Sequence, residues 1–366
     1  MPEIDQQWME RALNQAEQSV GLASPNPAVG CVLVRDDRLV GEGFHEYDQR
    51  DHAEIVALKQ TGPLARAATA YVTLEPCIHH GRTGPCADAL LAAGITRVVV
   101  ATADPNPLVR GKGIARLRAA GVEVTSGVGE DRARRLNDGF AKFITTGLPF
   151  VTMKVAATLD GRIAPAQRSA PYWITGEQAR AEVHRMRHAA DALIAGVGTI
   201  LADDPLLTDR SRLPRRRPLM RIVLDSKLRT PLDSQLVKTA DQDVLIFFSD
   251  ASQTAQKDLA SRGVRLIQIA GDGSHVDLRD VMARLAEMQI TSLLLEGGAE
   301  VHTSALNQGL VDKLMLFYAP RFLGEKAMPM LGSVEGVPAI DDFSLTRFGQ
   351  DFALEAYLRN PWLNLS

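Results

Sequence analysis

Two cysteines and a histidine in the first quarter of the 366-residue chain have the residue types of a catalytic zinc site. Cys77 and Cys86 lie in the stretch PCIHHGRTGPC, and His52 precedes them in DHAE. A catalytic zinc ion takes three protein ligands, commonly from histidine and cysteine, and leaves a fourth position open for water. We expect His52, Cys77 and Cys86 to be these ligands. Two alternatives stay open: His79 or His80 replaces His52, or the cysteines are only structural.

Glu54, two residues after His52, adds a group that can transfer protons. H-x-E followed by P-C-x-x-C is typical of zinc nucleobase deaminases, in which the glutamate is a general acid and base; here eight residues separate the two cysteines instead of two. Residues two apart on an ideal helix point about 160° apart, so His52 can share the site only from the helix's first turn. The Asp51-x-x-Glu54 pattern resembles a capping box and would place it there. The predicted reaction releases ammonia from an exocyclic amine of a pyrimidine or purine.

Composition excludes several classes of protein. A net charge of −3 gives no general attraction to nucleic acid or to an anionic membrane. Three cysteines are too few for a disulfide scaffold, so we expect reduced thiols in a cytoplasmic protein and no Cys77–Cys86 disulfide. Cys31, within the apolar GCVLV, is expected in the core. We see no signal peptide and no apolar run of about 18 residues, and we expect no membrane association.

The chain length favours two domains, and strand and helix patterns alternate in both halves. In the first half, GCVLVRDDRLVGEGFH predicts two strands joined by a tight turn. Helices are expected around Trp8–Val20 and in DHAEIVALKQ, CADALLAAGI and GIARLRAAG; further strands are expected in ATAYVTLEP, TRVVVATADP and VEVTSG. In the second half, strands are expected in VTMKVAATLDG, ALIAGV, RIVLDS, VLIFFS, VRLIQIA, SLLLEGG and KLMLFYAP, and helices in EQARAEVHRMRHAA and LRDVMARLAEMQ.

Two glycine patterns in the second half suggest a nucleotide site. GVGTIL follows a strand, but Leu201 stands where a dinucleotide-binding fingerprint has its third glycine. In LLLEGGAEV a strand ends in two glycines before a helix, where free backbone N–H groups are able to hold a cofactor phosphate. The loop SRLPRRRPLMR, residues 211–221, is basic and either lies in solvent or contacts a phosphate.

The motifs SPNPAVGCVLV, HAE, TLEPCIHHGRTGPC and DPNPLVRGKGI resemble the deaminase half of the bifunctional riboflavin-biosynthesis deaminase/reductase family. MKVAATLDGR, WITG, GVGTILADDPLLT and LLLEGGAEV resemble its reductase half, in the same order. The resemblance implies a cytidine-deaminase-like three-layer α/β/α domain at 1–146 and a dihydrofolate-reductase-like α/β domain at 147–366. It also implies Zn²⁺ and NADPH as cofactors, a phosphoribosyl pyrimidine as substrate, and a homo-oligomer, either dimer or tetramer.

The resemblance assigns residues to both sites. Asn26, His79 and Arg82 should contact the deaminase substrate, and Arg82 should bind the phosphate of that substrate. Lys154 and Asp160 are candidate catalytic groups near the sugar that the reductase reduces. The residues that should line the NADPH site are Ala157, Trp173, Thr199, Asp203, Ser226, Gly297, Gly298 and Ala299. The residues that should hold the reductase substrate are Arg187, Leu207, Arg210 and Glu296.

Two positions depart from the family pattern, because Ile78 and Pro171 stand where serine is usual. Each departure removes one polar contact, and Ser169 is the candidate replacement for the second. Two other functions remain possible from the residues. A deaminase of tRNA or single-stranded DNA would need a basic groove with stacking aromatics, against which the 5% aromatic content and the net negative charge argue. A non-catalytic nucleotide sensor would bind NADPH without turnover.

Overall fold

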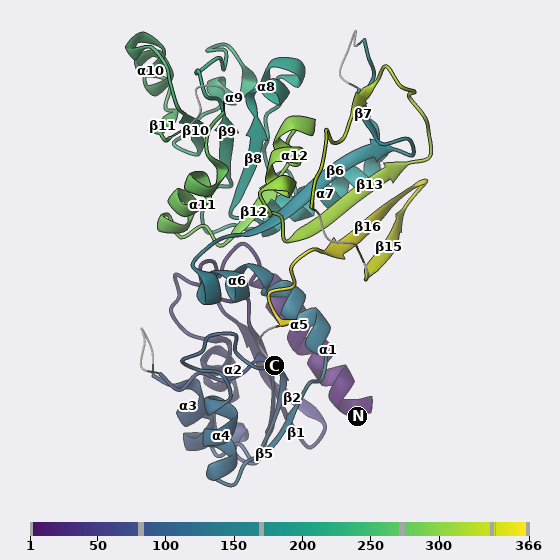
Figure 1. Ribbon diagram of the computed structural model, residues 1–366. Coiled ribbons are helices and arrows are strands. Elements are labelled where there is room, and N and C mark those ends of the chain that lie inside the picture. Colours follow the sequence, from purple (N-terminus) through teal and green to yellow (C-terminus); the bar gives the residue numbers. More distant parts are fainter. Residues whose placement is uncertain are drawn as a thin grey trace. The chain divides into compact units, whose positions relative to one another are not determined.

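A computed structural model of the chain describes residues 3–79, 84–167, 172–270, 275–336, 340 and 342–363 (Figure 1). The chain divides into two compact units. The first unit contains Met1–Gly147 together with two short later segments, Pro214–Arg217 and Pro361–Ser366; the second contains Leu148–Leu213 and Pro218–Asn360. Among the described helices, none combines the length and the hydropathy that crossing a membrane requires.

The first unit has one five-stranded sheet in the order β2-β1-β3-β4-β5. Strand β1 is antiparallel to both β2 and β3, whereas β3, β4 and β5 are parallel. Asp36 and Asp37, at φ 51° and 54°, form the expected tight turn between the first two strands. The strands are β1 (Gly30–Arg35), β2 (Arg38–Phe44), β3 (Thr69–Leu74), β4 (Arg97–Thr102) and β5 (Glu123–Ser126). The helices are α1 (Glu3–Gln18), α2 (Ala53–Thr61), α3 (Cys86–Ala92), α4 (Lys112–Ala119), α5 (Glu130–Leu136) and α6 (Asp138–Thr146), with a short 3₁₀ turn at Gly62–Ala65.

Alternation along β1 explains why helices cover both faces of this sheet. Cys31 and Leu33 pack with residues of α2, α3 and α4, whereas Val32 and Val34 pack with residues of α1 and α5. Successive side chains of a strand point to opposite faces, so a strand that is apolar at every position must be buried on both. The expected three-layer α/β/α domain is confirmed, and Cys31 is fully buried as expected.

The segment that begins at Pro361 also contributes a buried side chain to the first unit. The indole Nε1 of Trp362 donates a hydrogen bond of 2.9 Å to a carboxylate oxygen of Asp138. The guanidinium carbon of Arg134 lies 5.5 Å from the centroid of the same indole ring. Trp362 is 4% exposed, so this residue is part of the interior of the first unit.

The second unit is built on a nine-stranded sheet in the order β11-β10-β9-β8-β12-β6-β13-β16-β15. The strands from β11 to β13 are parallel, and β16 and β15 extend the sheet as an antiparallel hairpin. They are β6 (Phe150–Thr158), β8 (Ala192–Gly196), β9 (Met220–Leu224), β10 (Val244–Phe248), β11 (Arg265–Gln268), β12 (Ser292–Leu295), β13 (Lys313–Ala319), β15 (Phe343–Phe348) and β16 (Asp351–Tyr357), with a separate pair β7 (Arg162–Ala164) and β14 (Met328–Pro329).

Helices cover both faces of this sheet as well, which confirms the expected α/β class. On one face, residues of α11 and α12 pack on β6, β8, β9 and β10. On the other, residues of α8, α9 and α10 pack on β8, β9 and β10, and α7 packs on β13 and β16. These helices are α7 (Glu177–Ala189), α8 (Val197–Asp203), α9 (Gln235–Lys238), α10 (Gln253–Ala260), α11 (Leu278–Glu287) and α12 (Ala299–Asn307).

Candidate functional site

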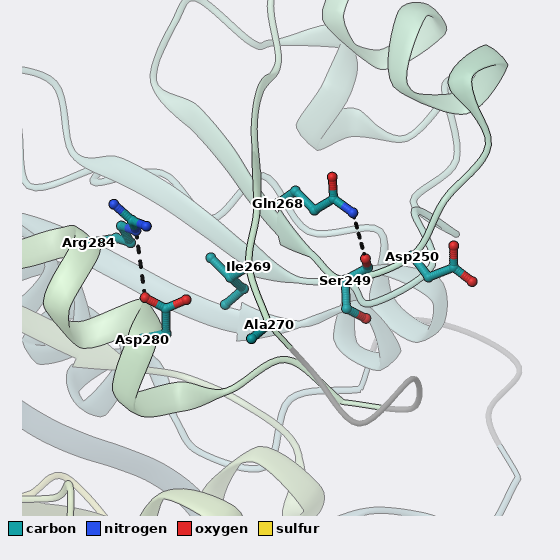
Figure 2. Close-up of a pocket in the computed structure, with 7 residues that line it drawn as sticks. All are labelled: Ser249, Asp250, Gln268, Ile269, Ala270, Asp280 and Arg284. Atoms are coloured by element: carbon teal, nitrogen blue, oxygen red, sulfur yellow. Dashed lines mark hydrogen bonds and ion pairs between the residues drawn. The ribbon is translucent and has the colours of Figure 1, made fainter.

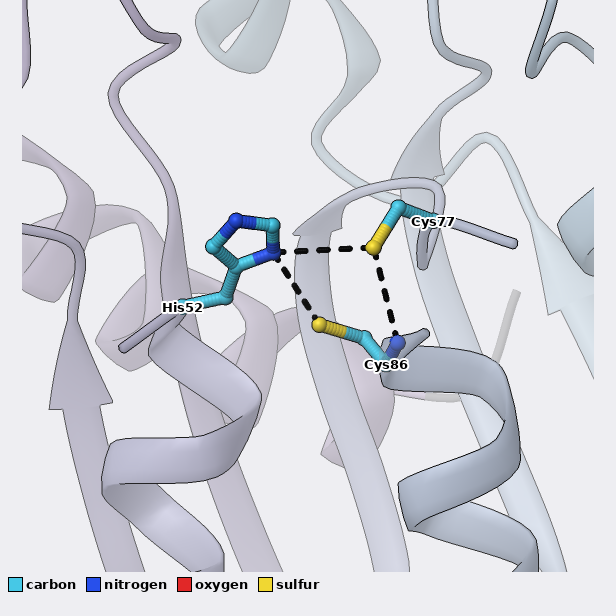
Figure 3. Close-up of side chains that lie close together, drawn as sticks. All are labelled: His52, Cys77 and Cys86. Atoms are coloured by element: carbon cyan, nitrogen blue, oxygen red, sulfur yellow. Dashed lines mark hydrogen bonds between the residues drawn. The ribbon is translucent and has the colours of Figure 1, made fainter. Parts of the chain in front are cut away.

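His52, Cys77 and Cys86 converge in the first unit (Figure 3). The Nδ1 atom of His52 lies 3.1 Å from the Sγ of Cys86 and 3.6 Å from the Sγ of Cys77, and the three donor atoms lie within 4.8 Å of one another. Two thiol sulfurs and one imidazole nitrogen are the donor set of a catalytic zinc site of the Cys₂His type. The residues therefore fit zinc, and they leave its fourth position for water.

The ends of three elements bring these ligands together. Cys77 follows β3, Cys86 is the first residue of α3, and His52 is the residue that caps the start of α2. His52 has extended backbone angles of φ −76° and ψ 161°, so its side chain is not constrained to the helical direction. The expected position of His52 at the helix start is confirmed. The expected capping box is wrong, because the Asp51 carboxylate instead accepts a hydrogen bond from Lys59.

The proximity of the two thiols shifts their pKa values in opposite directions. A hydrogen bond from Cys86 lowers the pKa of Cys77, and the same hydrogen bond raises the pKa of Cys86, with burial adding to that rise. The backbone N–H of Cys86 also donates to the Sγ of Cys77 at 3.4 Å. The hydrogen bond with Cys77 raises the pKa of His52. A bound cation would favour the thiolate form of both cysteines.

Glu54 lies in the first turn of α2 and is 3% exposed. Burial raises the pKa of Glu54 to about 7, although the nearby His52 acts in the opposite direction. A carboxyl group with a pKa near neutrality can both accept and donate a proton at the pH of the cell. The side chain also forms a hydrogen bond with Cys86, which places Glu54 beside the ligand cluster.

The carboxylate of Glu75, the residue directly after β3, holds the backbone next to Cys77. The two oxygens of Glu75 accept hydrogen bonds from the backbone N–H groups of Gly111 at 2.8 Å and Ile114 at 3.0 Å. A Cβ atom on Gly113 would lie 2.0 Å from the carbonyl oxygen of Pro76, so only glycine allows α4 to approach this closely. The GKG part of DPNPLVRGKGI thus packs against the backbone that leads into Cys77.

Asn26 is hydrogen-bonded to His45, a residue that our sequence analysis missed. The Nδ2 of Asn26 lies 3.0 Å from the Nε2 of His45, and the Nδ1 of His45 lies 2.8 Å from the carbonyl oxygen of Asp51. Since the carbonyl oxygen only accepts, Nδ1 of His45 carries the proton and Nε2 accepts from the amide of Asn26. The rings of His45 and His52 are 5.2 Å apart, edge to face. Asn26 and the metal cluster are thereby linked through His45.

The substrate contacts expected in the cysteine stretch are only partly described. His79 is exposed and Ile78 is half-buried. Arg82, and with it His80, lies outside the described residues, as do Ser169 and Pro171 in the second unit.

In the second unit, Lys154, Arg187 and Glu296 form one cluster. The Glu296 carboxylate accepts hydrogen bonds from Nε of Arg187 at 2.7 Å and Nη2 of Arg187 at 2.9 Å, and the Nζ of Lys154 lies 3.4 Å away. Burial alone would raise the pKa of Glu296, but the two cations outweigh it and hold the pKa at about 2. With two cations and one anion, the cluster keeps one net positive charge.

The other expected substrate residues lie in different surroundings. Asp160 does not join the cluster: its carboxylate accepts from the hydroxyl of Thr158 and from the N–H of Gly324 at 2.7 Å, and the Thr158 hydrogen bond lowers its pKa. Leu207 is buried at φ 54°, a left-handed conformation unusual for a leucine. Arg210 is exposed and acts electrostatically on His184, which lies one turn before Arg187 on α7.

Several of the expected NADPH residues follow the carboxyl ends of two neighbouring parallel strands. β8 leads directly into α8, and β12 leads through Glu296, Gly297 and Gly298 into α12. A Cβ atom on Gly198 or Gly298 would meet no heavy atom within 4 Å, so there is room beside both backbones. The N–H groups at the start of α12 point in the direction that binds anions, which fits a cofactor pyrophosphate.

The backbone N–H of Gly297 was expected to be free, but it is hydrogen-bonded. It donates a 3.1 Å hydrogen bond to Nε2 of His302, and the Nδ1 of His302 faces the carbonyl oxygen of Met330 at 3.4 Å. Burial lowers the pKa of His302 to about 4, so the imidazole is neutral at pH 7. His302 therefore fixes the glycine turn, and our sequence analysis did not identify it.

A cavity of about 560 Å³ lies at the carboxyl ends of β10 and β11 (Figure 2). Ser249 and Asp250 line it on the strand side, and Asp280 and Arg284 line it from α11. The carbonyl oxygen of Ser226 accepts the N–H groups of Ser249 at 3.1 Å and Asp250 at 2.9 Å. Ligands of parallel α/β sheets bind at this edge, so Ser226 adjoins a cavity in the expected place.

The remaining expected residues lie on the same strands and helices or beyond them. Ala157 is buried on β6, Thr199 is half-buried on α8, Ala299 begins α12, and Asp203 ends α8 and is exposed. Trp173 is 62% exposed, and the guanidinium carbon of Arg180 lies 5.2 Å from its ring centroid. A tryptophan of this exposure is not a core residue.

Comparisons with known proteins identify both units. Residues 2–102 match the cytidine and deoxycytidylate deaminase zinc-binding region, and residues 149–354 match the RibD C-terminal domain. The riboflavin biosynthesis protein RibD of Actinobacillus pleuropneumoniae is 43% identical over 98% of this chain and 96% of its own length. That of Escherichia coli is 39% identical over 96% of this chain and 98% of its own length.

Two solved structures are similar to this fold over nearly the whole chain. Acinetobacter baumannii RibD has a TM-score of 0.82 at 39% identity and covers 97% of this chain and 99% of its own. A Thermotoga maritima diaminohydroxyphosphoribosylaminopyrimidine deaminase/5-amino-6-(5-phosphoribosylamino)uracil reductase has a TM-score of 0.80 at 33% identity, covering 97% of this chain and 98% of its own. With a zinc-binding deaminase region in one unit and a RibD C-terminal domain in the other, the chain belongs to the RibD family of riboflavin biosynthesis proteins.

Proposed function

We infer that this chain catalyses two successive steps of riboflavin biosynthesis. The first unit deaminates 2,5-diamino-6-ribosylamino-4(3H)-pyrimidinone 5′-phosphate, and the second reduces the ribosyl chain of the product to a ribityl chain with NADPH. The observation that carries this function is the cluster of His52, Cys77 and Cys86 beside the buried Glu54, in a chain that also contains a RibD C-terminal domain. The same second domain disfavours a deaminase of nucleic acid.

In the deaminase site, the protein's own groups bind the substrate and move protons. His52, Cys77 and Cys86 would hold the zinc ion, which when bound lowers the pKa of water to about 7. Glu54 takes one proton from the attacking water and delivers it to the ring nitrogen, and then transfers the second water proton to the leaving amine, so that N=C–NH₂ and H₂O become HN–C=O and NH₃. Burial supports this role because it keeps Glu54 partly protonated near neutral pH.

Substrate contacts in this site follow from side-chain chemistry. The amide of Asn26 binds the edge of the pyrimidine, and His45 holds that amide in one orientation by accepting its N–H. His79 and Arg82 contact the substrate, and Arg82 binds its phosphate through a planar pair of donors.

In the reductase site, NADPH supplies the hydride that reduces C1′ of the opened ribose. The glycines at the start of α12 and α8 and the side chains of Trp173 and Ser226 form its binding site. Arg187 and Arg210 hold the substrate phosphate, and the Glu296 carboxylate orients both Arg187 and Lys154. Lys154 is then the proton donor that the reduction needs, whereas the carboxylate of Asp160 is occupied by backbone N–H groups.

A coupled assay tests both steps in one sample. Purified protein with Zn²⁺, NADPH and the diaminopyrimidinone substrate should release ammonia first and then consume an equal amount of NADPH. NADPH consumption without earlier ammonia release would contradict the assigned order. The absence of both signals would contradict the function as a whole.

We also propose that the protein acts in the cytoplasm as a homo-oligomer, either dimer or tetramer. The three cysteines are free thiols, as expected for a reducing compartment. The edge strand β15 exposes Phe343 by 52% and Leu345 by 60%, and such an apolar edge is usually covered by another chain. Light scattering of the purified protein should give two or four times the mass of the chain, and a monomer that persists at micromolar concentration would contradict the proposal.

A further inference from the structure

The segment Pro214–Arg217 belongs to the first unit, although Leu213 before it and Pro218 after it belong to the second. It is the centre of the basic loop for which the sequence left open a solvent or a phosphate environment. In the structure, Arg216 and Arg217 of this segment both donate hydrogen bonds to Ser24, which lies close in sequence to Asn26.

Arg216 makes four contacts that clamp two loops of the first unit. Its backbone N–H donates to the carbonyl oxygen of Gly21 at 2.9 Å, and its Nη1 donates to the carbonyl oxygen of Ser24 at 3.1 Å. Its Nε donates to Asp48 at 3.0 Å, and its guanidinium carbon lies 3.9 Å from the centroid of the Tyr47 ring. The backbone and the planar side chain of Arg216 thus join residues 21–24 to residues 47–48.

These two loops position the Asn26–His45 pair. Ser24 lies two residues before Asn26, and Tyr47 lies two residues after His45. The loops are also joined directly by the N–H of Tyr47, which donates to the carbonyl oxygen of Leu22 at 3.2 Å. A change in their separation would therefore alter the 3.0 Å contact between the two side chains.

We propose that Arg216 is a positioning residue of the deaminase site, through which a segment from the reductase part of the sequence completes the recognition of the pyrimidine. This inference rests on the proposed deaminase function and on the role of Asn26 in it. A guanidinium stacks on an aromatic face and donates hydrogen bonds in its own plane, which the point charge of a lysine cannot do at the same time.

The high exposure of Asp48 limits what its ion pair with Arg216 contributes to the stability of the fold. The side chain of Arg216 is 23% exposed and that of Asp48 is 70% exposed. An ion pair as exposed as this one contributes little to stability. Removing Arg216 should therefore leave the fold and the zinc ligands in place and affect the geometry of Asn26.

The test compares Arg216→Ala and Arg216→Lys with the wild type in steady-state deamination of the diaminopyrimidinone substrate. Arg66→Ala is the matched control, because Arg66 is an exposed arginine of the same unit whose guanidinium has no hydrogen bond or ion pair in the described part of the chain. Zinc content and NADPH-dependent reduction of the separately prepared deaminated intermediate are measured on every variant.

We expect Arg216→Ala to raise the KM of deamination about tenfold or more, with a smaller change in kcat, since misplacing a binding group by about 1 Å has effects of this size. Zinc content and reductase kinetics should match the wild type, Arg216→Lys should fall between the two, and Arg66→Ala should be unchanged. In an Asn26→Ala background, Arg216→Ala should add no further effect, because the two residues act as a unit.

Three results would overturn the inference. They are an unchanged KM in Arg216→Ala, additive effects with Asn26→Ala, or a parallel loss of zinc and of both activities, which would indicate a structural role. These results are distinct from failure of the proposed function, in which the wild type itself would release no ammonia.

Discussion

The guanidinium of Arg187 and the carboxylate of Glu296 form two parallel hydrogen bonds, Nε to Oε1 and Nη2 to Oε2, with side chains only 11% and 8% exposed. Removing one partner of a buried pair leaves the other charge without compensation, at a cost of about 3–5 kcal/mol. Glu296→Ala should therefore lower the free energy of unfolding by about this amount and abolish reduction. Urea unfolding measures the first effect and NADPH oxidation the second.

The control for Glu296→Ala is Glu287→Ala, which removes a carboxylate from an ion pair with Arg284 at the surface of the same unit. Its side chain is 67% exposed, so its loss should cost less than about 1 kcal/mol. Equal destabilisation by the two substitutions would show that the Glu296 carboxylate does not compensate buried positive charge.

His302 should make the stability of the protein depend on pH. Its folded pKa is lowered to about 4 by burial, so below the ordinary pKa of about 6.5 the unfolded chain binds a proton that the folded chain does not. The stability that neutral His302 provides is therefore complete above pH 6.5 and is lost as the pH falls toward 4. Between pH 7 and pH 5 the loss from this group should be about 2 kcal/mol.

Urea unfolding of the wild type and of His302→Gln at pH 7 and pH 5 measures that loss. Glutamine retains an acceptor for the N–H of Gly297 but does not titrate, so the variant should lose less stability over this interval. The same pH dependence in both proteins would mean that His302 is not buried in its neutral form.

Glu54→Gln should separate metal binding from catalysis. The amide keeps the size of the side chain but cannot move a proton, so kcat of deamination should fall by about 10²–10⁴-fold. Zinc content measured by atomic absorption should stay at the wild-type value, and reduction of the deaminated intermediate should be unaffected. Undiminished ammonia release in this variant would remove Glu54 from the mechanism.

Metal removal should affect one activity and leave the other. Dialysis against a zinc chelator should abolish ammonia release, while NADPH oxidation with the deaminated intermediate continues, because the metal ligands lie in the first unit alone. Added Zn²⁺ should restore deamination in the wild type but not in Cys86→Ala. Loss of both activities on chelation would show that the metal also supports the second unit.

The metal cluster was predictable from the sequence because its ligands lie at the ends of recognisable elements. His52, Cys77 and Cys86 each adjoin a strand or helix whose apolar pattern is clear, so their convergence follows from the order of those elements. The cap at Asp51 was not predictable in the same way, since its carboxylate pairs with Lys59, eight residues later. The local pattern Asp-x-x-Glu does not show that Lys59 competes with the start of the helix for the Asp51 carboxylate.

Residues that act through a tertiary contact escaped the sequence analysis. His45 and His302 belong to no motif, and their roles depend on partners 19 and 5 residues away that only the fold brings into reach. Short helices such as α8 and α9, of seven and four residues, give too few turns for a periodic pattern. The edge strand β15 has an exposed apolar face, so burial does not mark it either.

Nothing in the basic composition of Pro214–Arg217 indicates that it packs with the first unit. Its arginines have the pattern of a solvated loop, and only the positions of Ser24 and Tyr47 turn one of them into a clamp. The sequence patterns predicted a single boundary between two domains, whereas the first unit of the fold contains three separate segments of the chain.

The hydrogen bond between Trp362 and Asp138 spans 224 residues of sequence. During synthesis, the first unit therefore acquires the buried side chain of Trp362 only after the second unit, which ends at Asn360, has been made. Between those times the site of the Trp362 indole, next to Asp138 and Arg134, is open to water. Folding of the nascent first unit is thus completed by the arrival of a distant segment, and a chain released before Trp362 would carry both catalytic clusters but an incomplete interior.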